Sequence, residues 1–158
     1  MALQGCLKVG GRIYGVVHCE YGFRQEVDSA GKPTSRPAGG SITFVTPATS
    51  DNDTFFYKWM IHKTEKWSGV FRFCVYSNDN KRSIKTVQFL NAYCVGLRDC
   101  FDDQDSKLMY TTVTISAEVI RIGTGDGVML INEWGGTMES IRDQFENTMN
   151  QLGLGGMF

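Results

Sequence analysis

The sequence has little of what usually marks a catalytic, nucleic-acid-binding or membrane protein. Among 158 residues there are two histidines and 16 basic side chains against 17 acidic ones. A nucleic-acid surface or an electrostatic membrane contact needs an excess of basic charge, so near-neutrality argues against both. The chain also has no apolar run long enough to span a bilayer. We therefore expect no nucleic-acid partner and no membrane insertion.

Cysteine usage excludes a disulfide framework and argues against a zinc site. The five cysteines are an odd number and contain no Cys-x-x-Cys pair; they are Cys6, Cys19, Cys74, Cys94 and Cys100. We predict reduced, mostly buried thiols that bind no metal. Residues 1–8 lack the basic and apolar regions of a signal peptide, which predicts synthesis into the cytoplasm.

Convergent catalytic groups are scarce. His18 and Glu20 share a strand face and could join a metal or acid–base site, but a polar contact is the favoured interpretation. Residues 30–34 imitate the end of a P-loop, yet a strand rather than a helix follows. The glycines of 123–127 also lack a following helix, and the acidic run 99–105 lacks the EF-hand pattern. We predict that the chain is not an enzyme and has no cofactor.

Alternating apolar and polar residues predict an all-β fold with minor α content. The expected strands cover residues 3–9, 12–27, 41–46, 69–76, 84–97, 107–122 and 128–131. The second is long for one strand, so we expect a bend near Gly15 or Gly22 that lets it serve two sheets. Its apolar face carries Ile13 and Val17, and Tyr14 falls on the polar face.

Two helices are expected. Residues 54–62 form a short helix whose apolar stripe would lie on the β-domain, with N-cap candidates at 51–53. Near the C-terminus the period changes from two to that of a helix, between Thr137 as N-cap and Gly153 as the stop. The stripe of this amphipathic helix consists of Met138, Ile141, Phe145, Met149 and Leu152.

A loop rich in glycine and proline connects the second and third strands. Proline fixes φ and glycine permits unusual turns, so we expect this loop to be shaped rather than flexible. It could hold a ligand or dock on another protein. Its candidate contact residues are Asp28, Gly31, Lys32, Pro33, Ser35, Arg36, Pro37, Gly39 and Gly40.

The strand within 107–122 has an uncharged hydroxyl-bearing face. We assign to it Tyr110, Thr112, Thr114, Ser116 and Glu118. Such a face is common on a solvated sheet, and it would also suit a surface that faces a wet channel or a neighbouring subunit.

One segment closely resembles the signature of the type VI secretion tube proteins, the Hcp or TssD family, in its Bacteroidetes-type branch. The strand that leads into the loop carries His18, Tyr21, Phe23, Gln25 and Glu26, and the loop follows as Val27-Asp28-x-x-Gly31-x-Pro33-x-Ser35-Arg36-Pro37-x-Gly39-Gly40. Further similarity lies in Trp59-Met60, Thr114-Ile115-Ser116-Ala117 and Asn132-Glu133-Trp134. The resemblance covers about residues 3–134.

The resemblance implies a two-sheet β-barrel with one short helix alongside, to which this chain adds the C-terminal amphipathic helix. It further implies six copies in a ring and stacked rings that form a hollow tube. A contractile sheath would propel the tube with a spike at its tip and effectors in its lumen, and export would need no signal peptide. By analogy the loop 28–40 contacts an adjacent ring or subunit, and one sheet lines the lumen.

The sequence departs from the family after Trp134. We therefore divide it into an Hcp-like domain, residues 1–134, and a helical extension, residues 135–158. The helix could pack on its own β-domain, dock on a neighbour or enter the lumen, and a disordered Gly-rich tail is the remaining option. The extension leaves open whether the chain is a bulk tube subunit or a specialised paralogue. A small-ligand or glycan-binding β-barrel is the alternative function, suggested by the aromatic residues.

Overall fold

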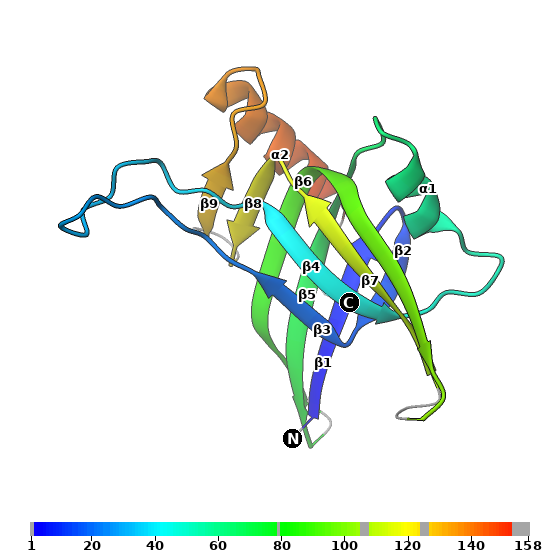
Figure 1. Cartoon of the computed structure of the whole chain (residues 1–158). Coiled ribbons are helices and arrows are strands. Elements are labelled where there is room, and N and C mark those ends of the chain that lie inside the picture. Colours follow the sequence, from blue (N-terminus) through cyan, green and yellow to red (C-terminus); the bar gives the residue numbers. More distant parts are fainter. Residues whose placement is uncertain (1, 79, 105–107, 124–126, 153–158) are drawn as a thin grey trace.

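The structure is a computed structural model that describes residues 2–78, 80–104, 108–123 and 127–152 (Figure 1). These residues form a fold of strands and two helices, as predicted. In chain order the elements are β1 (Ala2–Val9), β2 (Arg12–Val16), β3 (His18–Tyr21), β4 (Ser41–Pro47), α1 (Phe55–Ile61), β5 (Trp67–Ser77), β6 (Asn80–Asp102), β7 (Leu108–Ser116), β8 (Val119–Ile122), β9 (Val128–Ile131) and α2 (Met138–Leu152).

The strands form one antiparallel sheet in the order β2-β1-β5-β6-β7-β4-β3, and β8 pairs with both β6 and β9. The 23-residue strand β6 joins two halves of this sheet. Its first part pairs with β5, and residues from Tyr93 onward pair with β7. The two predicted sheets therefore correspond to two halves of one sheet, and closure into a barrel stays a prediction.

The single strand predicted over 12–27 is wrong, because the chain leaves one half of the sheet at Val17 and enters the other. β2 pairs with β1, whereas β3 pairs with β4. The backbone N–H of Val17 donates to the Val45 carbonyl at 2.9 Å. The break follows the end of β2 at Val16, next to Gly15, and β3 ends at Tyr21, next to Gly22. The expected bend that lets this segment serve two parts of the sheet therefore lies near Gly15.

The apolar face predicted for this segment holds in β3, where Cys19 and Tyr21 pack against the main core, and is wrong in β2 and at Val17. Ile13 and Val17 are 52% and 60% exposed, whereas Tyr14 and Val16 are buried. The reason is tertiary: the Tyr14 ring lies 4.6 Å from that of Phe56 on α1, and its hydroxyl donates to Asp53 Oδ2 at 3.0 Å. Both contacts hold Tyr14 toward the core.

The main core lies between the sheet and α1. The helix buries Phe56 and Trp59, and Trp59 Nε1 donates to the Ala92 carbonyl at 3.0 Å. The carboxylate of Asp53 accepts from the backbone N–H of Phe55 at 3.1 Å, so one of the predicted capping residues does bind the start of the helix.

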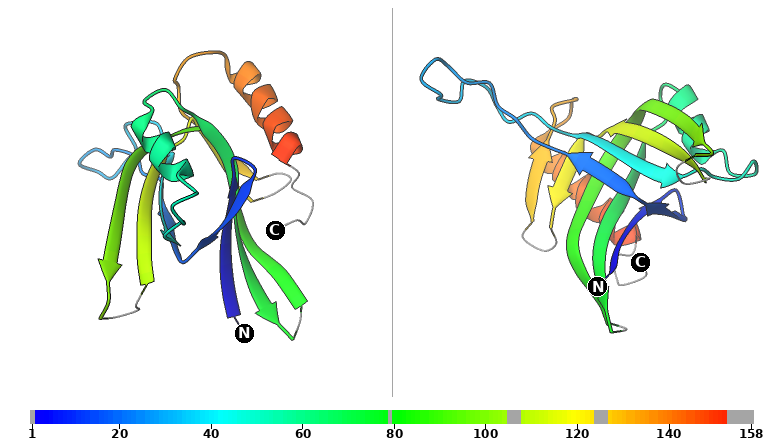
Figure 2. Two further views of the ribbon diagram at one scale, coloured as in Figure 1. Left: turned by 90° about the vertical axis from the view of Figure 1, so that its right-hand side faces the viewer. Right: turned by 60° about the horizontal axis from the view of Figure 1, so that its bottom comes forward.

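α2 packs against its own sheet on the side away from α1 (Figure 2). Ile141, Phe145 and Met149 are buried, whereas Met138 is 44% exposed. They form a second apolar cluster with residues of β5, β6, β8 and β9, namely Val70, Leu90, Val119, Met129 and Ile131. A disordered tail is therefore wrong for residues 138–152; residues 153–158, with the expected stop at Gly153, lie outside the described residues.

Polar contacts fix both ends of α2. At its start, Thr137 Oγ1 accepts from the backbone N–H of Ser140 at 3.1 Å, which is the predicted N-cap. At its end, Lys8 Nζ donates to the Leu152 carbonyl at 2.6 Å. Neither described helix is long and apolar enough to cross a membrane.

A buried arginine links α2 to the sheet between these ends. Arg121 donates to Gln88 Oε1 at 2.6 Å and to Glu146 Oε1 at 2.8 Å. Its guanidinium also lies 4.7 Å from the centre of the Phe145 ring. The charge is thus paired, hydrogen-bonded and covered by an aromatic face, which is how a protein tolerates a buried arginine.

Candidate functional site

The loop between β3 and β4 projects from the body of the protein as an arm, which we define as residues 22–40 (Figure 1). Residues 22–38 are all exposed. The two sides of the arm are joined by backbone hydrogen bonds between Arg24 and Ala38, at 3.0 and 2.7 Å, and by one from Thr34 to the Glu26 carbonyl at 2.8 Å. The arm is therefore held as an irregular hairpin, the shaped loop that its glycines and prolines predict.

The tip of the arm is closed by the side chain of Asp28. Its Oδ1 accepts from the backbone N–H groups of Ala30 and Lys32, both at 2.9 Å, and Gly31 adopts a φ of 83°. Ser35 Oγ accepts from the backbone N–H of Glu26 at 2.8 Å. These bonds fix the turn locally, so ordering the tip on contact with a partner costs little entropy.

The base of the arm is attached to the segment after β9. Arg36 forms an ion pair with Glu133, and Asn132 Nδ2 donates to the Gly39 carbonyl at 3.1 Å. A Cβ on Gly40, whose φ is 102°, would lie 2.5 Å from Asn132 Nδ2. These two segments lie more than 90 residues apart in the sequence. The contact between them could therefore not be predicted from the sequence, although Gly39 and Gly40 indicated that the backbone here needs unusual freedom.

Most strand residues of the family signature are exposed. His18 Nε2 lies 3.7 Å from Glu20 Oε2, and both side chains are more than half exposed. Tyr21 and Phe23 contact each other edge to face at 6.4 Å, and Gln25 is exposed. Within the part of the chain that the structure describes, no group of three His, Cys, Asp or Glu side chains could hold a metal ion.

Four of the five hydroxyl-face residues do share one side of β7. Tyr110, Thr112, Thr114 and Ser116 are half-buried and alternate with buried residues. Glu118 does not belong to this face: it lies beyond the end of β7, is 8% exposed and accepts from Asn91 Nδ2 at 2.8 Å. The error arose because the alternation was extended past the point at which the strand ends.

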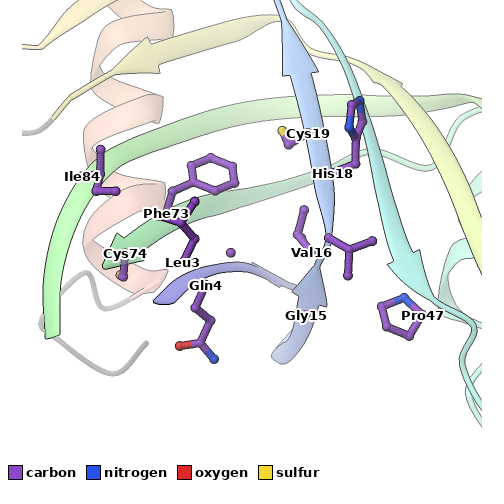
Figure 3. Close-up of a pocket in the computed structure, with 12 residues that line it drawn as sticks. Leu3, Gln4, Gly15, Val16, His18, Cys19, Pro47, Phe73, Cys74 and Ile84 are labelled. Atoms are coloured by element: carbon purple, nitrogen blue, oxygen red, sulfur yellow. The ribbon is translucent and has the colours of Figure 1, made fainter. Parts of the chain in front are cut away.

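A hollow of about 690 Å³ opens at the end of the sheet where β1 begins (Figure 3). We call it the mouth. β1, β5 and β6 form one side, and the β2–β3 junction with the end of β4 forms the other; the apolar lining includes Leu3, Val16, Val17, Pro47, Phe73 and Ile84. No sequence signal indicated this hollow, because its lining comes from six segments that only the tertiary fold brings together.

One of the mouth's thiols, Cys19, has a raised pKa. Burial, with a smaller contribution from Glu20, raises the pKa of the Cys19 thiol to about 12. A thiol with that pKa carries almost no thiolate near neutrality, so it is a poor nucleophile. The mouth therefore holds no activated cysteine at this position.

The family sequence model described as "Hemolysin coregulated protein Hcp (TssD)" matches residues 1–135. No match was found among curated proteins. Among solved structures, Hcp1 from Flavobacterium johnsoniae is similar, with 28% identity and a TM-score of 0.70 over 82% of this chain and 99% of that one. Hcp1 from the E. coli EAEC 042 pathovar is 16% identical, with a TM-score of 0.65 over 84% of this chain and 98% of that one.

A third similar structure shows the same fold at still lower identity. The secreted protein Hcp3 from Pseudomonas aeruginosa is 10% identical, with a TM-score of 0.55 over 85% of this chain and 100% of that one. Nearly all of each relative is matched by this chain, whereas α2 begins just after the region matched by the family model. The chain belongs to the Hcp (TssD) family, the tube proteins of type VI secretion.

Proposed function

We propose that this chain is a non-enzymatic tube subunit of a type VI secretion system. Six copies close into a ring, and rings stack into an inner tube that a contractile sheath propels. The observation that carries the proposal is the family match over residues 1–135. A ring requires a heterologous contact, in which one patch meets a different patch on the next copy.

The arm supports an assembly role for the loop residues 28–40. Its residues from 22 to 38 are exposed, its tip is fixed by its own hydrogen bonds, and its base is anchored at Arg36 and Gly39. A pre-organised projection with exposed apolar side chains is suited to docking on another protein surface. We assign the arm to the contact with another copy.

The remaining partners follow from the same proposal. The sheath and the spike bind the assembled tube, and effectors bind in its lumen. We propose the half-buried, uncharged face of Tyr110, Thr112, Thr114 and Ser116 as a lumen or interface surface. The subunit is made in the cytoplasm and exported by the apparatus itself.

The division into a tube domain, residues 1–134, and an extension, residues 135–158, is part of the proposal. Its support is that the family model matches residues 1–135 and α2 begins at Met138. Because α2 docks on its own sheet, we propose that the extension modifies the subunit surface. This addition favours a specialised subunit over an ordinary one.

Light scattering together with negative-stain imaging tests the function. Six copies of the 17.7 kDa chain give a particle of about 106 kDa, and images should show six-membered rings. A strictly monomeric species at high protein concentration would refute the proposal.

The mouth supports the alternative of a small-ligand-binding module, because it is a hollow with an apolar lining. Glycan binding would rest on the tryptophans that suggested it: Trp67 is half-buried, whereas Trp134 is 43% exposed and its ring lies 5.4 Å from that of Tyr93. A thermal-shift screen that finds a saturable small ligand for a chain that forms no ring would favour this alternative.

A further inference from the structure

The mouth leaves apolar side chains uncovered. Leu3, Val17 and Ile84 line it and are 79%, 60% and 51% exposed. They come from β1, the β2–β3 junction and β6, so together they form one concave apolar surface rather than scattered exposed residues. A concave apolar surface of this kind is typical of a binding site.

The arm carries exposed apolar side chains that need a surface of this kind. Phe23 and Val27 are 45% and 59% exposed. The arm's own mouth is out of reach, because Arg36 and Gly39 attach the base of the arm to the segment after β9. Figures 1 and 2 show the arm leaving the sheet away from the hairpin ends that flank the mouth.

Charge on the two elements is complementary as well. On the arm, the outgoing side carries Arg24 followed by Glu26 and Asp28 nearer the tip, and the returning side carries Lys32 and Arg36. At the mouth end, Arg82 and Lys85 flank Ile84 on the β5–β6 hairpin. The acidic pair Glu26 and Asp28 is therefore complementary to the basic Arg82 and Lys85 beside the mouth, and this pairing favours one orientation of docking.

We propose that the mouth receives the arm of another copy of this chain, in the next ring of the tube. Val27 and Phe23 cover Leu3, Val17 and Ile84, and the pairing of the arm's acidic residues with the basic residues beside the mouth favours one orientation. The projection and the hollow lie on different parts of one chain, so the contact between two copies is heterologous. Such a contact can repeat from one ring to the next without closing on itself, and a stack of rings requires this. The inference rests on the proposed function and adds the receiving surface of the arm.

Photo-cross-linking maps the contact directly, even where stacking is transient. Val27→p-benzoylphenylalanine places the probe on the arm, and Ile61→p-benzoylphenylalanine is a matched control because Ile61 is 76% exposed on α1. Mixing ¹⁵N-labelled and unlabelled chains identifies cross-links between copies. We expect the Val27 probe to mark mouth peptides around Leu3, Val17 and Ile84. Cross-links elsewhere, or none, would overturn the inference.

Paired charge substitutions test the direction of the contact. Val27→Asp disables the arm and Ile84→Asp the mouth; each should lower the stacked fraction at least about tenfold, because a carboxylate would be buried on an apolar surface. Hexamer mass should not change, and Ile61→Asp should stack normally. Mixing Val27→Asp rings with Ile84→Asp rings should give pairs of rings but no stacks of three or more rings. Within a pair, the intact arms of the Ile84→Asp ring meet the intact mouths of the Val27→Asp ring, and both outer faces of the pair are disabled.

The outcomes separate the two proposals. Single variants that stack like the wild type, or mixtures that form no pairs, overturn the arm–mouth contact and leave the tube function standing. A wild-type chain that remains a monomer at every concentration overturns both proposals.

Discussion

Replacing Phe145 with alanine should undock α2 and leave the sheet folded. Phe145 is completely buried, and truncating such a side chain costs about 3–5 kcal/mol. The other two fully docked stripe residues, Ile141 and Met149, contribute about 1.5–3 kcal/mol each by burial. Removing Phe145 therefore takes away the largest share of what holds the helix, and an isolated helix of 15 residues is marginal in water.

Hydrogen exchange measured by mass spectrometry is the assay. A loss of 3 kcal/mol or more should reduce protection of the amides in residues 138–152 by at least about a hundredfold. Peptides from β4 and β7 should keep theirs, because the main core lies on the other side of the sheet from α2. Met138→Ala is the control, since Met138 is 44% exposed and should change protection little.

Two results would refute this reasoning. Unchanged protection of α2 would mean that polar contacts such as the Arg121–Glu146 pair, at 2.8 Å, hold the helix without its apolar stripe. Loss of protection in α2 and β4 together would mean that the helix is an integral part of the cooperative fold rather than a separately docked element.

Three further predictions concern the arm and the thiols. Gly40→Ala should lower the free energy of unfolding by about 1–3 kcal/mol, because φ at this position is 102° and the new Cβ would meet the Asn132 amide. Thermal denaturation of the variant and the wild type measures this difference. Arg36→Ala should reduce ring stacking in negative-stain images with the melting temperature unchanged, because the exposed Arg36–Glu133 pair orients the arm rather than stabilises the fold; normal stacking would contradict this. With a pKa of about 12, roughly one Cys19 thiol in ten thousand is ionised at pH 8. Iodoacetamide should therefore modify exposed Cys100 long before Cys19, and the Cys19 rate should rise about tenfold per pH unit; equal rates would show that Cys19 is accessible.

Features that depend on residues close together in the sequence were predictable. The stripe of α2 follows from helical spacing, and the structure buries its three central residues, Ile141, Phe145 and Met149. The shaped arm follows from its glycines and prolines, because their backbone preferences act within a few residues. Most strands followed from alternation, with errors of a few residues at the ends. The segments predicted as single strands over 12–27 and 107–122 are each two strands, β2 with β3 and β7 with β8.

Features that depend on tertiary contact were not predictable from pattern alone. Alternation over 12–27 defines two faces but does not say which is inward, and the contacts of Tyr14 with Phe56 and Asp53 decide it. The break at Val17 follows from two different pairing partners, β1 and β4, on either side. The mouth, and the surface on which α2 docks, each combine several strands and leave no local signature.

The docking of α2 also limits how this chain can have changed by descent. A gene shortened to end before Met138 would place Val70, Leu90, Val119, Met129 and Ile131 on an open surface, a patch that favours aggregation. A gene that kept α2 and acquired polar residues at those positions would carry a helix with nothing to pack on. We therefore expect the helix and the apolar residues beneath it to be inherited together, and relatives that lack the helix to carry more polar residues at the equivalents of positions 70, 90 and 119.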